Sequence, residues 1–332
     1  MKSALKYYAK LDALLDAHIF FTALELDIFT ALDAGKTAEE AAASLSVDTG
    51  TYDGFNFGSA QSIKILLDVL TIQGLITVDG NCYRNTDETQ QFLSRSGASY
   101  IGDVLLYRKR LSDICNETET RSKTASAQPV FDFAEMARIT AREIAVLRKE
   151  PLLMLIKKLN LTPQKVLDLG GGSGSLLIAV AETYKKCEGV FFEQKDVASI
   201  AQGYIDTSPA KNRISIMEGN FLSDDIGEGY DFIIASGIFP FAQAMLEPLV
   251  KKISNALQKD GVLLVYDTAF AAGKDKPRYA ARWLKGNLKR KNQSPSKEMI
   301  ITALNSVNLK EITADADGLY PVIVFRKVCD DK

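Results

Sequence analysis

Histidine and tryptophan are almost absent from this chain, and cysteine is sparse. The 332 residues include one His, one Trp and four Cys. A single histidine, His18, cannot build a multi-histidine metal site and leaves the commonest general base of enzymes almost unrepresented. The cysteines lie far apart and form no C-x-x-C pair, which argues against a disulfide framework or a thiolate zinc site. We therefore expect reduced thiols and no metal centre.

An excess of charge of one sign and long apolar runs are also missing. The chain has 40 Lys and Arg against 42 Asp and Glu, a formal net charge of −2. This balance removes the global electrostatic reason to expect nucleic acid or an anionic membrane as a partner. Asp12, Asp16, Glu25 and Asp27 interrupt the apolar N-terminal stretch, so neither a signal peptide nor a spanning helix fits. We expect a cytoplasmic protein.

The first part of the chain has helical patterning. Apolar positions at helical spacing predict a helix over residues 4–34, and a capping-box pattern with Glu40 three residues after Thr37 opens a short helix to Leu45. Residues 61–73 are helical again, and a hairpin follows around Asp79–Gly80. Three helices followed by a β-ribbon predict a winged helix.

From Lys165 onward, short β-branched apolar runs alternate with helix-forming segments, which is typical of an α/β fold with a parallel sheet covered on both faces. Two final runs, Leu309–Thr313 and Pro321–Val328, are separated only by a short acidic segment, so we expect them to pair antiparallel. The earlier predicted strands are Lys165–Leu169, Gly189–Glu193, Ile214–Met217, Tyr230–Ala235 and Gly261–Asp267.

A glycine-rich loop lies where the first of these strands turns into a helix. Gly170, Gly172 and Gly174 form a G-x-G-x-G pattern, and missing side chains let a ligand approach the backbone and the free N–H groups of the helix. Ser175 stands where a dinucleotide-binding fingerprint needs a third glycine or alanine, which favours a ligand without a pyrophosphate. Glu193 ends the next strand, where a carboxylate can accept both hydroxyl protons of a ribose.

These features together resemble the S-adenosylmethionine (SAM) site of a class I methyltransferase. The whole chain resembles the small-molecule O-methyltransferases of the caffeate and hydroxyindole type, because Ala23–Phe29, Leu66–Leu70, Gly74–Ile76 and the glycine loop follow in that family's order. The resemblance implies a Rossmann-like class I methyltransferase domain, with a mostly parallel seven-stranded sheet and an antiparallel C-terminal hairpin. An α-helical, winged-helix-like dimerisation domain precedes it.

The same resemblance divides the chain into three parts. It implies a dimerisation domain over residues 1–95, a helical linker over 96–150 that contributes to the acceptor pocket, and a SAM-binding domain over 151–332. We therefore expect a homodimer that binds a small-molecule acceptor and no nucleic acid.

The resemblance also implies the cofactor contacts, with SAM as cofactor and S-adenosylhomocysteine (SAH) as product. The loop glycines approach the methionine part of SAM, and Glu193 holds the ribose. Asn220 replaces a family aspartate beside the adenine, and its amide can still bond to the base edge. The implied cofactor residues are Asp168, Gly170, Gly171, Gly172, Ser173, Gly174, Glu193, Gln194, Asn220, Phe221, Ser236 and Gly237.

The family's catalytic histidine is missing. Pro240 falls on the position of that histidine, and Phe241 falls on the aspartate that follows it. Asp267 matches a family glutamate that supports the histidine, and it is the candidate catalytic group, against the alternative of a helix cap or a solvated strand end. Without a base, an acidic acceptor reacts more readily than a phenol with a pKa near ~10.

Several apolar side chains are candidates for the acceptor pocket, although aromatic and Met side chains on helices are more often core residues. An apolar pocket would suit an aromatic or lipophilic acceptor. In the family the N-terminal helices exchange between subunits, which lets His18 act across the dimer, while packing is the alternative role. The candidate pocket residues are Phe133, Met136, Phe239, Phe241, Trp283 and His18.

The sequence leads to a SAM-dependent methyltransferase acting on a small molecule, by family precedent at oxygen. An alternative is C- or S-methylation, or a SAM-dependent reaction without methyl transfer. A further alternative is a ligand-responsive DNA-binding regulator, but its recognition helix offers only one cation, Lys64, and also carries Asp68. The acceptor and the general base stay open.

Overall fold

The computed structural model describes residues 2–45, 59–112, 132–267, 270, 294–315 and 321–328. The chain forms two compact units, Met1–Asp113 and Ile114–Lys332. Within the described ranges, no helix is both long enough and apolar enough to cross a membrane.

The N-terminal unit is helical and carries one β-hairpin. β1 pairs antiparallel with β2, so the hairpin predicted around Asp79–Gly80 is confirmed. The predicted capping box is also confirmed: Thr37 Oγ1 accepts the Glu40 N–H at 3.2 Å, and Glu40 Oε2 accepts the Thr37 N–H at 2.9 Å. The elements are α1 (Lys2–Glu25), α2 (Ile28–Ala31), α3 (Ala38–Ser44), α4 (Ala60–Ile72), β1 (Ile76–Asp79), β2 (Cys82–Asn85), α5 (Asp87–Phe92) and α6 (Gly102–Ser112).

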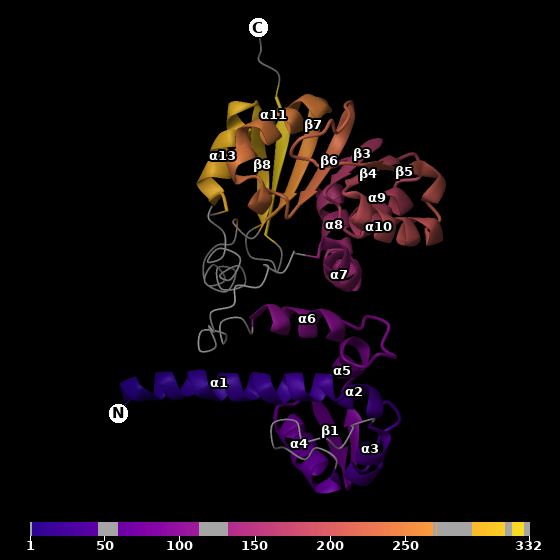
Figure 1. The fold of residues 1–332 in the computed structure, drawn as a ribbon, viewed down its shortest axis with the longest axis vertical. Coiled ribbons are helices and arrows are strands. Elements are labelled where there is room, and N and C mark those ends of the chain that lie inside the picture. Colours follow the sequence, from indigo (N-terminus) through magenta and orange to yellow (C-terminus); the bar gives the residue numbers. More distant parts are fainter. Residues whose placement is uncertain are drawn as a thin grey trace, which may run out of the picture. The chain divides into compact units, whose positions relative to one another are not determined.

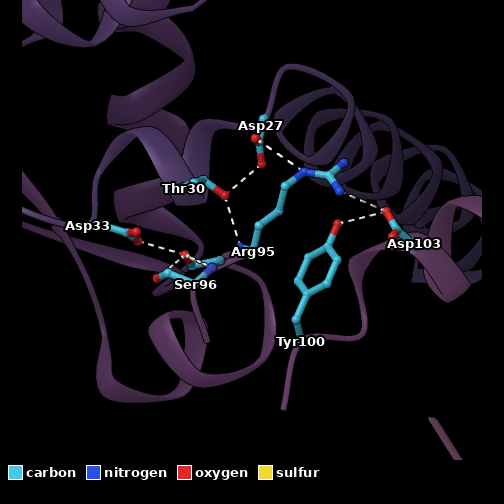
Figure 2. A network of polar contacts seen from close by, with 8 residues as sticks. Asp27, Thr30, Asp33, Arg95, Ser96, Tyr100 and Asp103 are labelled. Atoms are coloured by element: carbon cyan, nitrogen blue, oxygen red, sulfur yellow. Dashed lines mark hydrogen bonds and ion pairs between the residues drawn. The ribbon is translucent and has the colours of Figure 1, made fainter. Parts of the chain in front are cut away.

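The prediction of one continuous helix over residues 4–34 is wrong. The helix breaks between α1 and α2 because Asp27 has a left-handed φ of +57°. Asp27 Oδ1 accepts the Thr30 hydroxyl at 2.7 Å, and its Oδ2 lies 3.3 Å from Arg95 Nε. Figure 2 shows Arg95 reaching from this turn to Asp103, with Nη1 and Oδ1 3.3 Å apart. Since Arg95 comes from a distant part of the chain, periodicity alone does not reveal the break.

The C-terminal unit is built on a seven-stranded sheet of order β5-β4-β3-β6-β7-β9-β8. The first five strands in this order are parallel, and β9 is antiparallel to both β7 and β8. The predicted α/β sheet with an antiparallel C-terminal pair is therefore confirmed. The strands are β3 (Lys165–Leu169), β4 (Glu188–Glu193), β5 (Ile214–Glu218), β6 (Tyr230–Ser236), β7 (Leu257–Tyr266), β8 (Leu309–Asp315) and β9 (Val322–Lys327).

Helices cover both faces of this sheet (Figure 1). Val166 of β3 packs in a core cluster with α8, α9 and α10, whereas Leu167 and Leu169 pack in the cluster with α11 and α13. Side chains alternate along a strand, so Asp168 occupies a position on the face of Val166. The helices are α7 (Phe133–Leu147), α8 (Lys149–Lys158), α9 (Ser175–Thr183), α10 (Lys195–Thr207), α11 (Leu246–Ala256) and α13 (Lys297–Ser306).

The strand order predicts where a ligand binds. From β3 the chain continues to β4 and β5 on one side of the sheet, and β6 and β7 then lie on the other side. In open α/β sheets, ligands bind outside the carboxyl ends of the strands at such a reversal of strand order. The crevice is therefore expected at the carboxyl ends of β3 and β6.

Candidate active site

The glycine loop joins the carboxyl end of β3 to the amino end of α9. Gly170, Gly172 and Gly174 have left-handed φ angles of +67°, +58° and +73°, which other residues rarely adopt. A Cβ at Gly172 would meet no atom within 4 Å, so the backbone has open space beside it. The hydroxyls of Ser173 and Ser175 lie 2.8 Å apart at the start of the helix. The predicted strand-to-helix turn is confirmed, and it leaves room for a ligand.

A fully buried carboxyl group, Asp168, lies against this loop. A Cβ at Gly171 would lie 2.5 Å from Asp168 Oδ2, so only glycine fits there. Among the described residues, neither carboxyl oxygen has a hydrogen-bond partner of good geometry. Burial and, second, the charge of Glu193 raise the pKa of Asp168 to about 7, while the Arg148 charge and the Leu177 N–H lower it less. A buried acid in a ligand crevice is expected to bond to a ligand or to water.

Glu193 is the last residue of β4 and faces the same loop. Its Oε2 accepts the Gly172 N–H at 3.2 Å, and its Oε1 accepts the Gln194 N–H at 2.9 Å. Burial raises the pKa of Glu193, and these two backbone bonds oppose the rise. Each carboxylate oxygen has a second lone pair, so Glu193 can still accept two hydroxyl protons from a ligand.

The loop after β5 carries Asn220 and is held by two residues that sequence reasoning missed. Asn220 Oδ1 accepts the Leu222 N–H at 3.0 Å, and Asp224 Oδ2 accepts the Asn220 N–H at 2.8 Å. Lys252 Nζ, on α11, donates to the carbonyl oxygens of Phe221 and Asp224 at 3.1 and 2.6 Å. Because the Asn220 Oδ1 already accepts one hydrogen bond, the NH₂ group is the part of this side chain that can donate to the edge of a base. No local pattern links Lys252 to this loop.

The segment after β6 has no proton-accepting side chain at the position of the family histidine. Pro240 is buried in the short 3₁₀ helix Phe239–Phe241. Asp267 directly follows β7 and is buried, and its N–H donates to the Pro321 carbonyl at 3.2 Å. Since β6 and β7 are parallel neighbours, Asp267 lies at the same edge of the sheet as the glycine loop.

The structure brings two of the candidate pocket residues together. The rings of Phe133 and Phe241 pack edge to face, with centroids 5.4 Å apart. Met136 is half-buried on α7, about one helical turn after Phe133. Phe239 is fully buried in the core cluster that includes α11. An apolar surface formed by Phe133 and Phe241 is therefore present in the C-terminal unit.

The other two candidates are not among the described residues of the C-terminal unit. His18 is exposed on α1 in the N-terminal unit, and Trp283 lies outside the described residues. In the described part of the chain, no group of three or more His, Cys, Asp or Glu side chains is arranged to hold a metal ion.

A buried arginine at the crevice is a third residue that sequence reasoning missed. Arg148 connects α7 to α8, and its Nη2 donates to Ser236 Oγ at 2.5 Å. Its guanidinium carbon lies 4.6 Å from the centroid of the Tyr266 ring. Gly237, with a φ of +72°, donates its N–H to the Tyr266 carbonyl at 2.9 Å. These contacts join the carboxyl ends of β6 and β7 to the helices before β3.

Comparison with known proteins agrees with this geometry. Acetylserotonin O-methyltransferase of Bos taurus is 26% identical over 287 residues, which cover 80% of each chain. The N,N-dimethyltransferase OxyT of Streptomyces rimosus is 25% identical over 267 residues, covering 76% of this chain and 74% of its own. The crystal structure of human N-acetylserotonin methyltransferase in complex with SAM superposes with a TM-score of 0.76 at 18% identity and covers 99% of both chains.

The family model of the O-methyltransferase domain matches residues 131–285. This span includes the glycine loop, Glu193, the Asn220 loop and the segment around Pro240. Residues 131–285 of the chain therefore resemble the O-methyltransferase domain.

Proposed function

We propose that this protein is a SAM-dependent methyltransferase that acts on a small molecule, with oxygen as the acceptor atom. The observation that carries the proposal is the pairing of the open glycine loop with Glu193, whose carboxylate is bonded to the Gly172 N–H. An open backbone beside a carboxylate fits a ligand that combines an amino acid end with a ribose.

The residues of the crevice fit SAM in their chemistry. Glu193 can accept the ribose hydroxyls, and the NH₂ group of Asn220 can donate to a ring nitrogen of adenine. Asp168 is a buried acid whose oxygens have no hydrogen-bond partner of good geometry among the described residues, and a cationic ligand group is a suitable neighbour for it. When bound, SAM supplies a methyl group on a positively charged sulfur, which needs no metal to react.

The protein's own contribution is mainly to position the acceptor and exclude water. Phe133 and Phe241 offer an apolar surface that suits an aromatic or lipophilic acceptor. Asp267 is the candidate group that takes the proton from the acceptor at its carboxylate. A nitrogen acceptor is the second candidate, because OxyT, a relative over most of the chain, is named an N,N-dimethyltransferase.

Isothermal titration with SAM and with SAH tests the proposed function. We expect both to bind with micromolar dissociation constants, since both contain the ribose and the amino acid end that the crevice fits. If neither binds to the folded protein at millimolar concentration, the proposed function is wrong.

Replacing Asp267 with asparagine is expected to reduce methyl transfer by about 100-fold or more, because a positioned base contributes roughly 10²–10⁴ in rate. SAM affinity should stay within about twofold, because the proposed role of Asp267 is to take a proton from the acceptor and not to bind the cofactor. Turnover is measured with an acceptor found by screening acidic and phenolic compounds, and affinity by titration. Unchanged turnover would remove Asp267 from the mechanism.

The N-terminal unit is proposed to have a winged-helix arrangement and to form a homodimer in the cytoplasm. The supporting observation is α1, on which Leu11, Leu14 and Leu15 are each about half exposed, with exposed fractions of 50–52%. Sedimentation equilibrium measures the mass in solution, and a monomer would contradict the proposal. On α4, Lys64 Nζ donates to Asp68 at 2.7 Å, so this cation is neutralised locally and gives the DNA-binding alternative no support.

A further inference from the structure

A buried arginine lies at the carboxyl edge of the sheet, beside the proposed cofactor crevice. Arg148 is only 8% exposed although a guanidinium is costly to remove from water. It contacts Ser236 and the Tyr266 ring, which belong to the last residues of β6 and β7 and are register partners. The guanidinium therefore lies over the ends of two adjacent strands.

These contacts hold the guanidinium in one orientation. A hydrogen bond to Ser236 fixes one edge of the planar group, and stacking on Tyr266 fixes its plane. A guanidinium can donate two parallel hydrogen bonds to a carboxylate, and a group fixed before binding loses less entropy when it does so. Arg148 is therefore preorganised as a carboxylate-binding group.

The charged groups near the glycine loop are complementary in sign to those of an amino acid ligand. Asp168 lies against the loop at Gly171, and the positive charge of Arg148 acts on Asp168, where it opposes the larger effects of burial and Glu193 that raise the pKa. The crevice thus has a carboxyl group and a guanidinium close to one loop. The amino acid end of SAM carries one ammonium and one carboxylate, which is the complementary pair.

We propose that Arg148 binds the carboxylate of the amino acid end of SAM, with Ser236 and Tyr266 positioning its guanidinium. The inference rests on the proposed function, since it names a residue for one end of the proposed cofactor. It assigns the cofactor's carboxylate to a residue that connects α7 to α8, outside the glycine loop and the strand ends.

The test compares two ligands that differ in the amino acid end. SAH carries the carboxylate, whereas 5′-methylthioadenosine has the same adenosine part without an amino acid. We expect Arg148→Met to weaken SAH binding by about 10- to 100-fold, the loss typical of hydrogen bonds to a charged group. Binding of 5′-methylthioadenosine should change by less than about twofold. Arg148→Lys keeps the positive charge but cannot donate two parallel hydrogen bonds to a carboxylate. Its loss of SAH affinity should therefore lie between that of Arg148→Met and none.

A matched control is Arg142→Met, which removes an exposed arginine from α7 and should leave both affinities unchanged. Thermal melting of each variant checks that it is folded, and Arg148→Lys carries the test if Arg148→Met does not fold. Equal losses for both ligands would overturn the inference, because they would mean a structural role. Unchanged SAH binding would also overturn it. If the unmodified protein binds neither ligand, the proposed function itself fails.

Discussion

Gly172→Ala is expected to weaken binding of SAM and SAH by about 100-fold or more while the protein stays folded. Gly172 has a φ of +58°, and a Cβ there would project into open space beside Glu193 rather than into the protein. The left-handed conformation costs alanine about 1–2 kcal/mol, which a domain of this size tolerates. The added methyl group occupies space that the proposed function gives to the cofactor, so the loss falls mainly on binding.

Gly80→Ala is the matched control for this prediction. Gly80 has a nearly identical φ of +61°, and a Cβ there also meets no atom within 4 Å, but it lies in the hairpin turn of the N-terminal unit. Both variants therefore carry the same backbone strain. Thermal melting of the two variants measures the cost of backbone strain, and titration with SAH measures whether the added methyl group blocks the crevice. Equal affinities in the two variants would mean that the cofactor does not lie over Gly172.

The positions of the strands could be predicted closely from the sequence because the strands are buried. β3, β4 and β6 are buried on both faces, so their sequences are nearly continuous apolar runs that end in glycine or polar residues. The glycine loop was also predictable, since the positive φ of Gly170, Gly172 and Gly174 and the close approach of Asp168 to Gly171 require glycine locally. Local backbone requirements leave a readable trace in the sequence.

Interactions between distant residues leave no such trace. Asp27, at the break, contacts Arg95, and Arg148 is oriented by Ser236, 88 positions later. Lys252 on α11 donates to the Asn220 loop although it lies 31 positions after Phe221. In each case the partner is chosen by the packing of the fold, so an isolated Arg or Lys in the sequence gives no indication of its role.

The second large effect expected is a pH dependence that originates at Asp168. Burial and the charge of Glu193 raise its pKa to about 7, against the opposing effects of Arg148 and the Leu177 N–H. In the unfolded chain the pKa returns to its ordinary value of about 3.9. Between these values the folded protein holds a proton that the unfolded chain releases. The free energy of unfolding should therefore fall by up to a few kcal/mol as pH rises from about 4 to about 7, and then level off.

Cofactor binding should depend on pH in the opposite direction. SAM brings a positive sulfur and an ammonium group into the crevice, so it favours the ionised form of Asp168. By linkage, SAM affinity should rise by up to about tenfold as pH increases from 6 to 8, and Asp168→Asn, which cannot ionise, should abolish the rise. Titrations at both pH values and urea unfolding without ligand measure the two effects. Asp206→Asn, an exposed carboxylate on α10, is the control and should keep both pH dependences. A SAM affinity that rises equally in Asp168→Asn would assign the pH dependence to another group, with Glu193 the first to examine because burial also raises its pKa.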